Sequence, residues 1–279
     1  MMQVTSPLRD EWIAINAMVR KRWQISLRYP LSFAFWTLSP ILFILPMIIY
    51  SSFISGGRYN ANLLELTGTA DVWLFVGIGL VTLRFMLAIM WESTYTIREE
   101  ELLGTLEAVY TSPISRFSLI LGNTLFSAER ASGVLAVQLI AAWFLFPEIS
   151  AERIGIALIY VVIAVVFVQG LAMFLAGIVL TLKQGWKIIF TFEMFLSIIT
   201  PSAFPLAVLP APLQAISKWS PFTIIIEGFR NTLLLGPSPT IVKDIMTVAL
   251  MSVIVYFIGV YSFNRMEQRL RTKGLIGKY

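Results

Sequence analysis

The sequence contains no cysteine and no histidine. Without cysteine, the chain can form no disulfide bond and offers no thiolate as a nucleophile or metal ligand. Without histidine, it lacks the side chain that most often acts as a general base or proton relay near neutral pH. These absences exclude Cys/His metal sites and argue against a membrane-embedded enzyme.

Charged residues are also scarce. They make up 13% of the 279 residues, whereas hydrophobic residues make up 57%. A soluble domain carries about 25% charged and about 45–50% apolar residues. The composition therefore predicts an all-α polytopic membrane protein. The net charge of +5 fits basic loops facing the cytoplasm, and without a soluble basic module we expect no nucleic-acid partner.

Long apolar stretches predict six membrane-spanning helices. A hydrocarbon core of about 30 Å requires about 20 residues of helix. The fifth stretch is short, and two prolines within the first stretch predict kinks, since neighbouring helices can satisfy the freed carbonyls. The expected spans are residues 31–54, 71–92, 117–146, 153–182, 186–201 and 241–263. The corresponding division is an interfacial segment 1–30, a six-span transmembrane domain 31–263 and a basic tail 264–279.

The distribution of lysine and arginine predicts the orientation. If both termini are cytoplasmic, 14 of the 21 Lys and Arg residues lie on the cytoplasmic side and two lie within spans. The remaining five lie on the opposite side, at Arg58, Arg153, Lys218, Arg230 and Lys243. Because short cytoplasmic loops are enriched in positive charge, this bias predicts cytoplasmic N- and C-termini.

The N-terminal segment has the pattern of an amphipathic helix. Over residues 8–29, apolar side chains recur at spacings of three and four, and most basic residues lie off that stripe. We expect a helix that lies in the cytoplasmic membrane interface in contact with lipid; a solvated leader is the alternative. The apolar stripe consists of Leu8, Trp12, Ile15, Val19 and Trp23.

Residues 97–111 form the one strongly charged segment in the middle of the chain. Leu102 and Leu106 keep helical spacing, and acidic residues near the start would favour the helix macrodipole. Pro113 would end the helix. Gly104 would cost about 1 kcal/mol in a helix interior, which close packing of another group on that face would explain. The pattern predicts a short cytoplasmic helix that either lies in a partner's groove or touches only lipid headgroups.

Four charged residues fall within the expected spans, at Arg84, Glu129, Arg130 and Glu193. A charge at mid-depth costs about 2.5–3.5 kcal/mol, so each should face protein or water. From the helical rise, Arg84 and Glu129 lie at overlapping depths. We expect these two to pair, with Arg130 and Glu193 as alternates. Such pairs either fix helix packing or form a polar gate.

Residues 201–240 contain seven prolines among apolar residues. A continuous spanning helix cannot carry that density of proline. Broken helices at membrane depth occur where they line a cavity or are buried in protein, so we expect a re-entrant region that includes Pro221. Glu227 and Arg230 lie three residues apart and could pair on one helix face. The region is either an exit gate or an extracellular cap.

Two motifs resemble the signatures of ABC type-2 permeases, the membrane subunits of ATP-binding-cassette exporters. The first consists of Glu101-Leu102-Leu103-Gly104-Thr105-Leu106-Glu107, Thr111-Ser112-Pro113-Ile114-Ser115-Arg116 and Leu121-Gly122-Asn123. The second is Trp219-Ser220-Pro221-Phe222, followed by Glu227-Gly228-Phe229-Arg230. The layout of an interfacial helix, six spans and a re-entrant region before the last span is also similar. Asn123 departs from the lysine common in relatives.

The resemblance implies a mechanism and partners. Residues 97–111 would be a coupling helix seated in a cytoplasmic ATPase subunit, with two ATPase copies and two permease copies, most simply a homodimer, in a prokaryotic inner membrane. ATP and Mg would be bound by the ATPase, because this chain has no Gly-x-x-x-x-Gly-Lys-Ser/Thr motif and holds no cofactor. The implied contact residues are Glu99, Glu100, Glu101, Leu102, Gly104, Thr105, Leu106, Glu107 and Pro113.

The family includes exporters of drugs, lipids and glycans, and we expect a drug or another hydrophobic small molecule as the substrate. A lipid or a lipid-linked glycan is the alternative. A transporter driven by ions is an alternative of another class, but such a protein is expected to show repeated halves and midplane acidic or histidine relays. The sequence has no evident repeat and no histidine.

Overall fold

The computed structural model describes residues 7–105, 108, 111, 115–145, 149–182 and 185–272. Within these residues the chain folds into helices and contains no strand, which confirms the predicted all-α class. The helices are α1 (Pro7–Arg28), α2 (Pro30–Ile54), α3 (Ala61–Thr67), α4 (Val72–Leu102), α6 (Arg116–Leu145), α7 (Ala151–Thr181), α8 (Gly185–Ile199), the 3₁₀ turn η1 (Leu206–Val208), α9 (Ala211–Lys218), α10 (Pro221–Leu234) and α11 (Ile241–Thr272).

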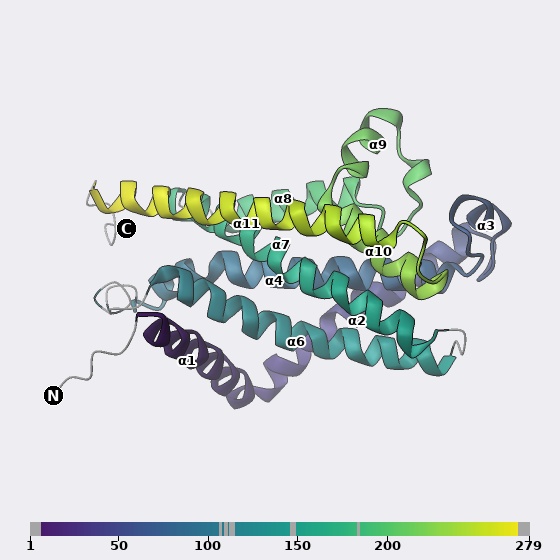
Figure 1. Cartoon of the computed structure of the whole chain (residues 1–279). Helices are drawn as coiled ribbons and strands as arrows, with labels where there is room; N and C mark the ends of the chain where they lie inside the picture. Colours follow the sequence, from purple (N-terminus) through teal and green to yellow (C-terminus); the bar gives the residue numbers. More distant parts are fainter. Residues whose placement is uncertain are drawn as a thin grey trace.

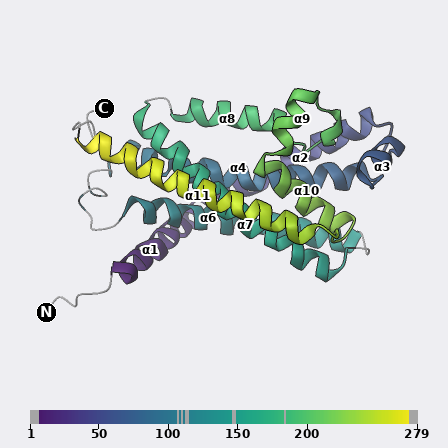
Figure 2. The same ribbon diagram turned by 45° about the horizontal axis from the view of Figure 1, so that its top comes forward.

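The longer helices form an elongated bundle (Figure 1). α2, α4, α6, α7, α8 and α11 run back and forth along its long axis. Both ends of the described chain lie at the end of the bundle where α4 finishes and α6 begins, whereas α3 and α9 lie at the opposite end (Figures 1 and 2). We call these the terminal end and the α9 end.

Among the residues that the structure describes, three helices have the length and apolar composition needed to cross a membrane: Val72–Leu102, Ala151–Thr181 and the Ile241–Arg269 part of α11. The molecule is therefore a helical membrane protein. α8 has 15 residues, a rise of about 22 Å, which is short for a core of about 30 Å. The expectation of six spans thus remains a prediction.

α4 is the most buried of these helices. Within its most apolar window, 67% of the residues are buried inside the molecule, compared with 39% for α7 and 17% for α11. α11 accordingly presents exposed apolar side chains such as Phe257 and Tyr261. α4 is therefore the central strut of the bundle, and α11 lies at its periphery.

α7 and α11 cross in very close contact. A Cβ atom built on Gly259 would lie 1.9 Å from the carbonyl oxygen of Gly170, and one on Gly170 would lie 2.4 Å from Cα of Tyr256. Helices approach this closely in membranes only where small residues face each other. The two glycines therefore set the distance between α7 and α11.

α1 is a separate helix, as predicted, but its buried face matches the predicted stripe only in part, at Ile15. Ala14, Ile15 and Met18 are buried, whereas Trp12 is 60% exposed. This face packs on α6, where a Cβ atom on Gly122 would lie 2.7 Å from Cβ of Met18. The apolar stripe alone could not reveal this, because a helix that also contacts protein need not bury its most hydrophobic side chains.

Residues 201–240 are broken into short elements, in agreement with their proline content. η1, α9 and α10 follow one another, and α9 and α10 each carry a proline in the first turn. Pro221 is the first residue of α10, where its missing N–H leaves no helical bond unmade. The segment occupies the α9 end of the bundle (Figure 1).

Candidate functional site

α4 does not stop near residue 92 but continues to Leu102. The prediction of a separate helix over 97–111 is therefore wrong for residues 97–102, which are the last turns of the central strut. Gly104 follows in the left-handed conformation, with a φ of 71°. It closes a Schellman motif, in which Gly104 N donates to Glu101 O at 3.1 Å and Thr105 N donates to Glu100 O at 2.9 Å.

Gly104 is thus a helix-terminating residue rather than an interior one. No atom of the described chain lies within 4 Å of the Cβ that it lacks, so the described chain supplies no close packing on this residue, and packing by a partner stays a prediction. Glycine is required here because its backbone adopts a positive φ at little cost. Of the remaining residues assigned to this segment, Leu106, Glu107 and Pro113 lie outside the described residues.

The acidic cluster consequently lies at the C-terminal end of a helix, where the macrodipole disfavours negative charge. The prediction that these acidic residues lie in the first turn of a helix is therefore wrong. Cations of the same chain offset this cost, two of them from α1. The ion pairs are Lys21–Glu100 (2.8 Å), Arg22–Glu99 and Arg98–Glu101 (2.5 Å).

Glu100 is the innermost of these acids, with 3% of the residue exposed. Burial by itself would raise the pKa of its carboxyl group. Hydrogen bonds donated by Lys21 and Thr105, together with the charges of Lys21 and Arg22, outweigh that effect and lower the pKa below its usual 4.5. The side chain of Glu100 thus holds α1 against α4, and its predicted contact with a partner stays a prediction.

α1 is also bonded to the first turn of α6. The hydroxyl groups of Ser115 and Ser118 both donate to a carboxylate oxygen of Glu11, that of Ser115 at 2.8 Å. At the same end, Arg116 lies 3.4 Å from Glu267 of α11. Polar contacts thus join α1, α4, α6 and α11 around the α4–α6 connection.

The last turn of α4 presents two exposed apolar side chains at this end. Leu102 and Leu103 are 63% and 64% exposed, and Gly104 and Thr105 are exposed beside them. We call residues 102–105 the terminal knuckle. The two adjacent leucines are exposed on a turn that the Schellman motif fixes.

A buried polar seam joins α4 to α6. Asn123 Nδ2 donates at 2.7 Å to both the Glu92 carbonyl and the Thr96 hydroxyl, and the Thr124 hydroxyl donates to Ser93 at 2.6 Å. Asn123 had been noted only as a departure from the family pattern. Its amide is a short donor that fits between two helices packed this closely, and helical spacing of Ser, Thr and Asn on both helices was the signal for the seam.

Glu92 continues this seam toward the bundle centre. Its carboxylate pairs with Arg130 and accepts a hydrogen bond from Ser127. Arg130 therefore pairs with a residue outside the predicted set. Glu129 lies apart, where it accepts a hydrogen bond from Trp23 Nε1 at 2.7 Å.

The predicted Arg84–Glu129 pair is wrong. Arg84 Nη1 instead lies 2.9 Å from Glu193 of α8, the expected alternate, and Trp91 Nε1 donates to the other oxygen of Glu193 at 2.6 Å. The Arg84 guanidinium also lies over Phe43 at 5.1 Å. An estimate of depth along the helix axes does not reveal which helices are neighbours.

This Arg84–Glu193 pair is open to its surroundings, with side-chain exposures of 36% and 18%. Charges at mid-depth are excluded from lipid and face protein or water. If the pair lies at mid-depth, as the sequence predicts, the side of α4 and α8 that carries it is expected to face protein or water.

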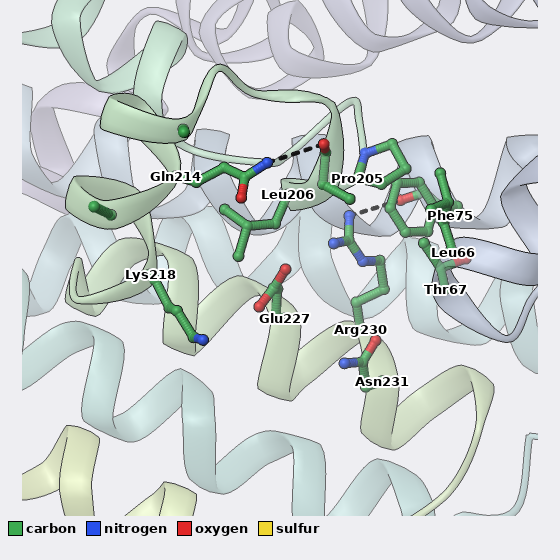
Figure 3. A pocket seen from close by; sticks show the side chains of 13 residues that line it. Leu66, Thr67, Phe75, Pro205, Leu206, Gln214, Lys218, Glu227, Arg230 and Asn231 are labelled. Carbon is green, nitrogen blue, oxygen red and sulfur yellow. Dashed lines mark hydrogen bonds between the residues drawn. The ribbon is translucent and has the colours of Figure 1, made fainter.

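At the α9 end, Arg230 of α10 is 1% exposed. Its Nη1 donates to the carbonyl oxygens of Pro201 and Ser202 at 3.2 and 3.3 Å, and its guanidinium lies 3.6 Å from the centre of the Phe75 ring. Within the described residues, no ion pair joins Arg230 to Glu227, although both line the same cavity (Figure 3).

The molecule is a helical bundle in which ion pairs and hydrogen bonds hold the α4–α6 connection at one end, and short broken helices lie at the other end. A family model described as ABC-2 type transporter matches residues 13–234. This chain belongs to the ABC-2 type transporter family. A comparison with curated proteins finds no match. An ABC-2 type permease works with an ATP-binding partner.

The match includes α1, the α4–α6 connection and α10. Both ends of the bundle therefore belong to the part of the chain that is shared with the ABC-2 family. The Lys21–Glu100 pair and the terminal knuckle lie within it, as does the α9-end cavity.

Proposed function

We propose that the chain is the permease subunit of an ABC exporter and that its ATPase docks on the terminal knuckle. The observation that carries this proposal is the braced end of α4, where charged side chains are satisfied within the chain and Leu102 and Leu103 remain exposed. A partner that seats on this turn would press on a rigid element.

The contacts that hold α1, α4 and α6 together also support a way to transmit a movement of the ATPase into the membrane part of the chain. α4 is one helix from the knuckle to its N-terminal turn, and the polar seam fixes α6 to it. A displacement of the knuckle would therefore move α1, α4 and α6 together. Arg84 lies on this unit and Glu193 on α8, so the Arg84–Glu193 pair would separate or close as the unit moves.

The assembly that we propose contains two ATPase copies and two copies of this chain. The Arg84–Glu193 pair would face the partner permease and line the translocation path, because a charged pair at mid-depth faces protein or water rather than lipid. α2, α4, α6, α7, α8 and α11 would each cross a prokaryotic inner membrane, with the terminal end cytoplasmic, as the Lys/Arg bias predicts.

We propose a drug or another hydrophobic small molecule as the cargo. The path between α4 and α8 would be mainly apolar with one charged pair, a composition typical of small-molecule sites. A lipid or lipid-linked glycan is the alternative cargo. ATP and Mg would be bound by the separate ATPase.

Reconstituted vesicles test this function. Vesicles containing the permease and its ATPase should transport a fluorescent cationic dye when ATP is supplied, and vesicles lacking the ATPase should not. Transport that persists without the ATPase in an ion gradient would contradict the proposal and favour secondary transport.

A further inference from the structure

A cavity of about 600 Å³ lies at the α9 end, within the size range of small-ligand sites, about 300–1,000 Å³. Its walls come from α3, the first turn of α4, η1, α9 and α10 (Figure 3). Apolar side chains such as Leu66, Phe75 and Leu206 line it together with a few polar groups. It is distant from the terminal knuckle, which lies at the other end of the bundle (Figure 1).

Three charged groups in this cavity have bonding capacity to spare. Within the described residues, Arg230 donates its hydrogen bonds through Nη1, and its Nη2 has no hydrogen-bond partner. The carboxylate of Glu227 and the ammonium of Lys218 take part in no hydrogen bond or ion pair within the same part of the chain. Figure 3 shows the Glu227 carboxylate between Lys218 and Arg230. Buried charge is normally paired, so this arrangement points to a ligand with complementary charges.

The charges of Lys218, Arg230 and Glu227 are complementary to a ligand that carries both a negative and a positive group. A phosphate could accept hydrogen bonds from Lys218 and Arg230, since both are donors only. A carboxylate is acceptor-only when ionised, so Glu227 would receive an N–H donor of positive charge. A ligand with one phosphate and one primary ammonium a few bonds apart satisfies all three.

The surroundings favour a lipid over a soluble zwitterion. Trp219, next to Lys218, is 72% exposed, and Val208 and Ile216 are 63% and 52% exposed at the same end. Exposed tryptophan beside lysine is typical of the membrane–water interface. An acyl chain could lie on these apolar side chains while the headgroup occupies the cavity.

We propose that the α9-end cavity binds the headgroup of a phospholipid that carries a primary amine, with the phosphate on Lys218 and Arg230 and the ammonium on Glu227. This site goes beyond the proposed exporter function and does not depend on it. Phosphatidylethanolamine fits, whereas phosphatidylcholine has no N–H to donate and phosphatidylglycerol has no cation.

The test measures lipid binding by the purified full chain, without ATPase or ATP. Fluorescent phosphatidylethanolamine, phosphatidylcholine and phosphatidylglycerol are titrated into the detergent-solubilised protein. We expect phosphatidylethanolamine to bind about tenfold tighter than phosphatidylcholine, as one charge-assisted bond contributes about 1.4 kcal/mol or more. Glu227→Gln should remove this preference, and Lys218→Ala should weaken phosphatidylethanolamine and phosphatidylglycerol alike.

The matched control is Glu65→Gln. Glu65 is exposed on α3 at the same end but does not line the cavity, so this variant should bind all three lipids as the unmodified chain does. Equal binding of phosphatidylethanolamine and phosphatidylcholine, or a preference that survives Glu227→Gln, would overturn the proposal. If Glu227→Gln fails to fold, the lipid binding of Lys218→Ala tests the site instead, because Lys218 is exposed and its replacement should not disturb folding.

A competition experiment separates the two sources of the headgroup. Free phosphoethanolamine should displace the fluorescent lipid only at far higher concentration than unlabelled phosphatidylethanolamine, because it lacks the acyl chains. Equal potency would show a site for a soluble ligand and would contradict the lipid assignment. Because no ATPase is present, neither result bears on ATP-driven transport.

Discussion

Lys21 Nζ lies 2.8 Å from a carboxylate oxygen of Glu100, although 79 residues separate them in the sequence. This pair joins the N-terminal helix to the last turn of the central strut. It places an ammonium against acidic residues that the α4 macrodipole would otherwise disfavour. The orientation of the terminal knuckle relative to α1 therefore depends on it.

Breaking this pair should destabilise the terminal end. We expect Lys21→Met to lower the free energy of unfolding by about 1 kcal/mol, a modest loss because solvent screens the half-exposed ammonium. Thermal unfolding in detergent measures the change. Arg20→Met, at an exposed neighbouring position of α1, is the control and should leave the Tm unchanged. Combining Lys21→Met with Glu100→Gln should be less harmful than the sum of the two single changes.

The ionisation of Glu100 predicts how the stability of the folded chain depends on pH. Its pKa in the folded protein is below 4.5, so the ionised form favours folding. The stabilisation should be complete above about pH 4.5 and should be lost as the pH falls through the lower folded-state pKa. Tm values between pH 6 and pH 3 should therefore fall less steeply for Glu100→Gln than for the unmodified chain. Parallel curves for the two proteins would show that Glu100 does not contribute.

The Arg84–Glu193 pair predicts a specific rescue. Arg84→Glu and Glu193→Arg should each cost about 2 kcal/mol, because each leaves like charges together at mid-depth. The double variant should recover much of the lost stability and folded yield. Arg84→Glu with Glu129→Arg should show no recovery, since Glu129 contacts Trp23 instead. Recovery in the second double variant alone would reverse the assignment.

The α7–α11 crossing should tolerate no side chain at Gly259. Gly259→Leu is expected to cost about 3 kcal/mol, because the added atoms meet the backbone of α7. Size-exclusion chromatography and thermal unfolding would report the loss as aggregation and a lowered Tm. Gly155→Leu is the control, because nothing lies within 4 Å of its Cβ position. Equal Tm values for the two variants would show that the crossing is not so close.

Hydropathy predicted the helical membrane class, and it predicted where α6 and α7 begin and end to within two residues. It could not predict that α4 continues to Leu102. Residues 93–102 are polar yet helix-compatible, and the features that stabilise them are contacts with α1 made from 77 to 79 residues away. Gly104 was read as an interior residue for the same reason, because a terminating glycine is recognised only once the helix end is known.

The candidate sites show the same contrast between local sequence patterns, which could be predicted, and contacts between distant residues, which could not. The segment that contains the knuckle was identified from its sequence, because its charges and glycine stand out against apolar neighbours. The partners of Arg84, Arg130 and Glu129 were not, because pairing depends on which helices are adjacent in the bundle. The α9-end cavity assembles residues from α3 to α10 and has no local sequence pattern.

The measurement that tests the central claim most directly is the affinity of the ATPase for knuckle variants. Leu103 at the knuckle and Leu64 at the α9 end are both exposed leucines, at 64% and 49%. We predict that Leu103→Asp weakens ATPase binding to the purified permease at least about tenfold, the equivalent of about 1.4 kcal/mol, whereas Leu64→Asp leaves it unchanged. Equal affinity of the ATPase for both variants and the unmodified chain would contradict docking on the terminal knuckle.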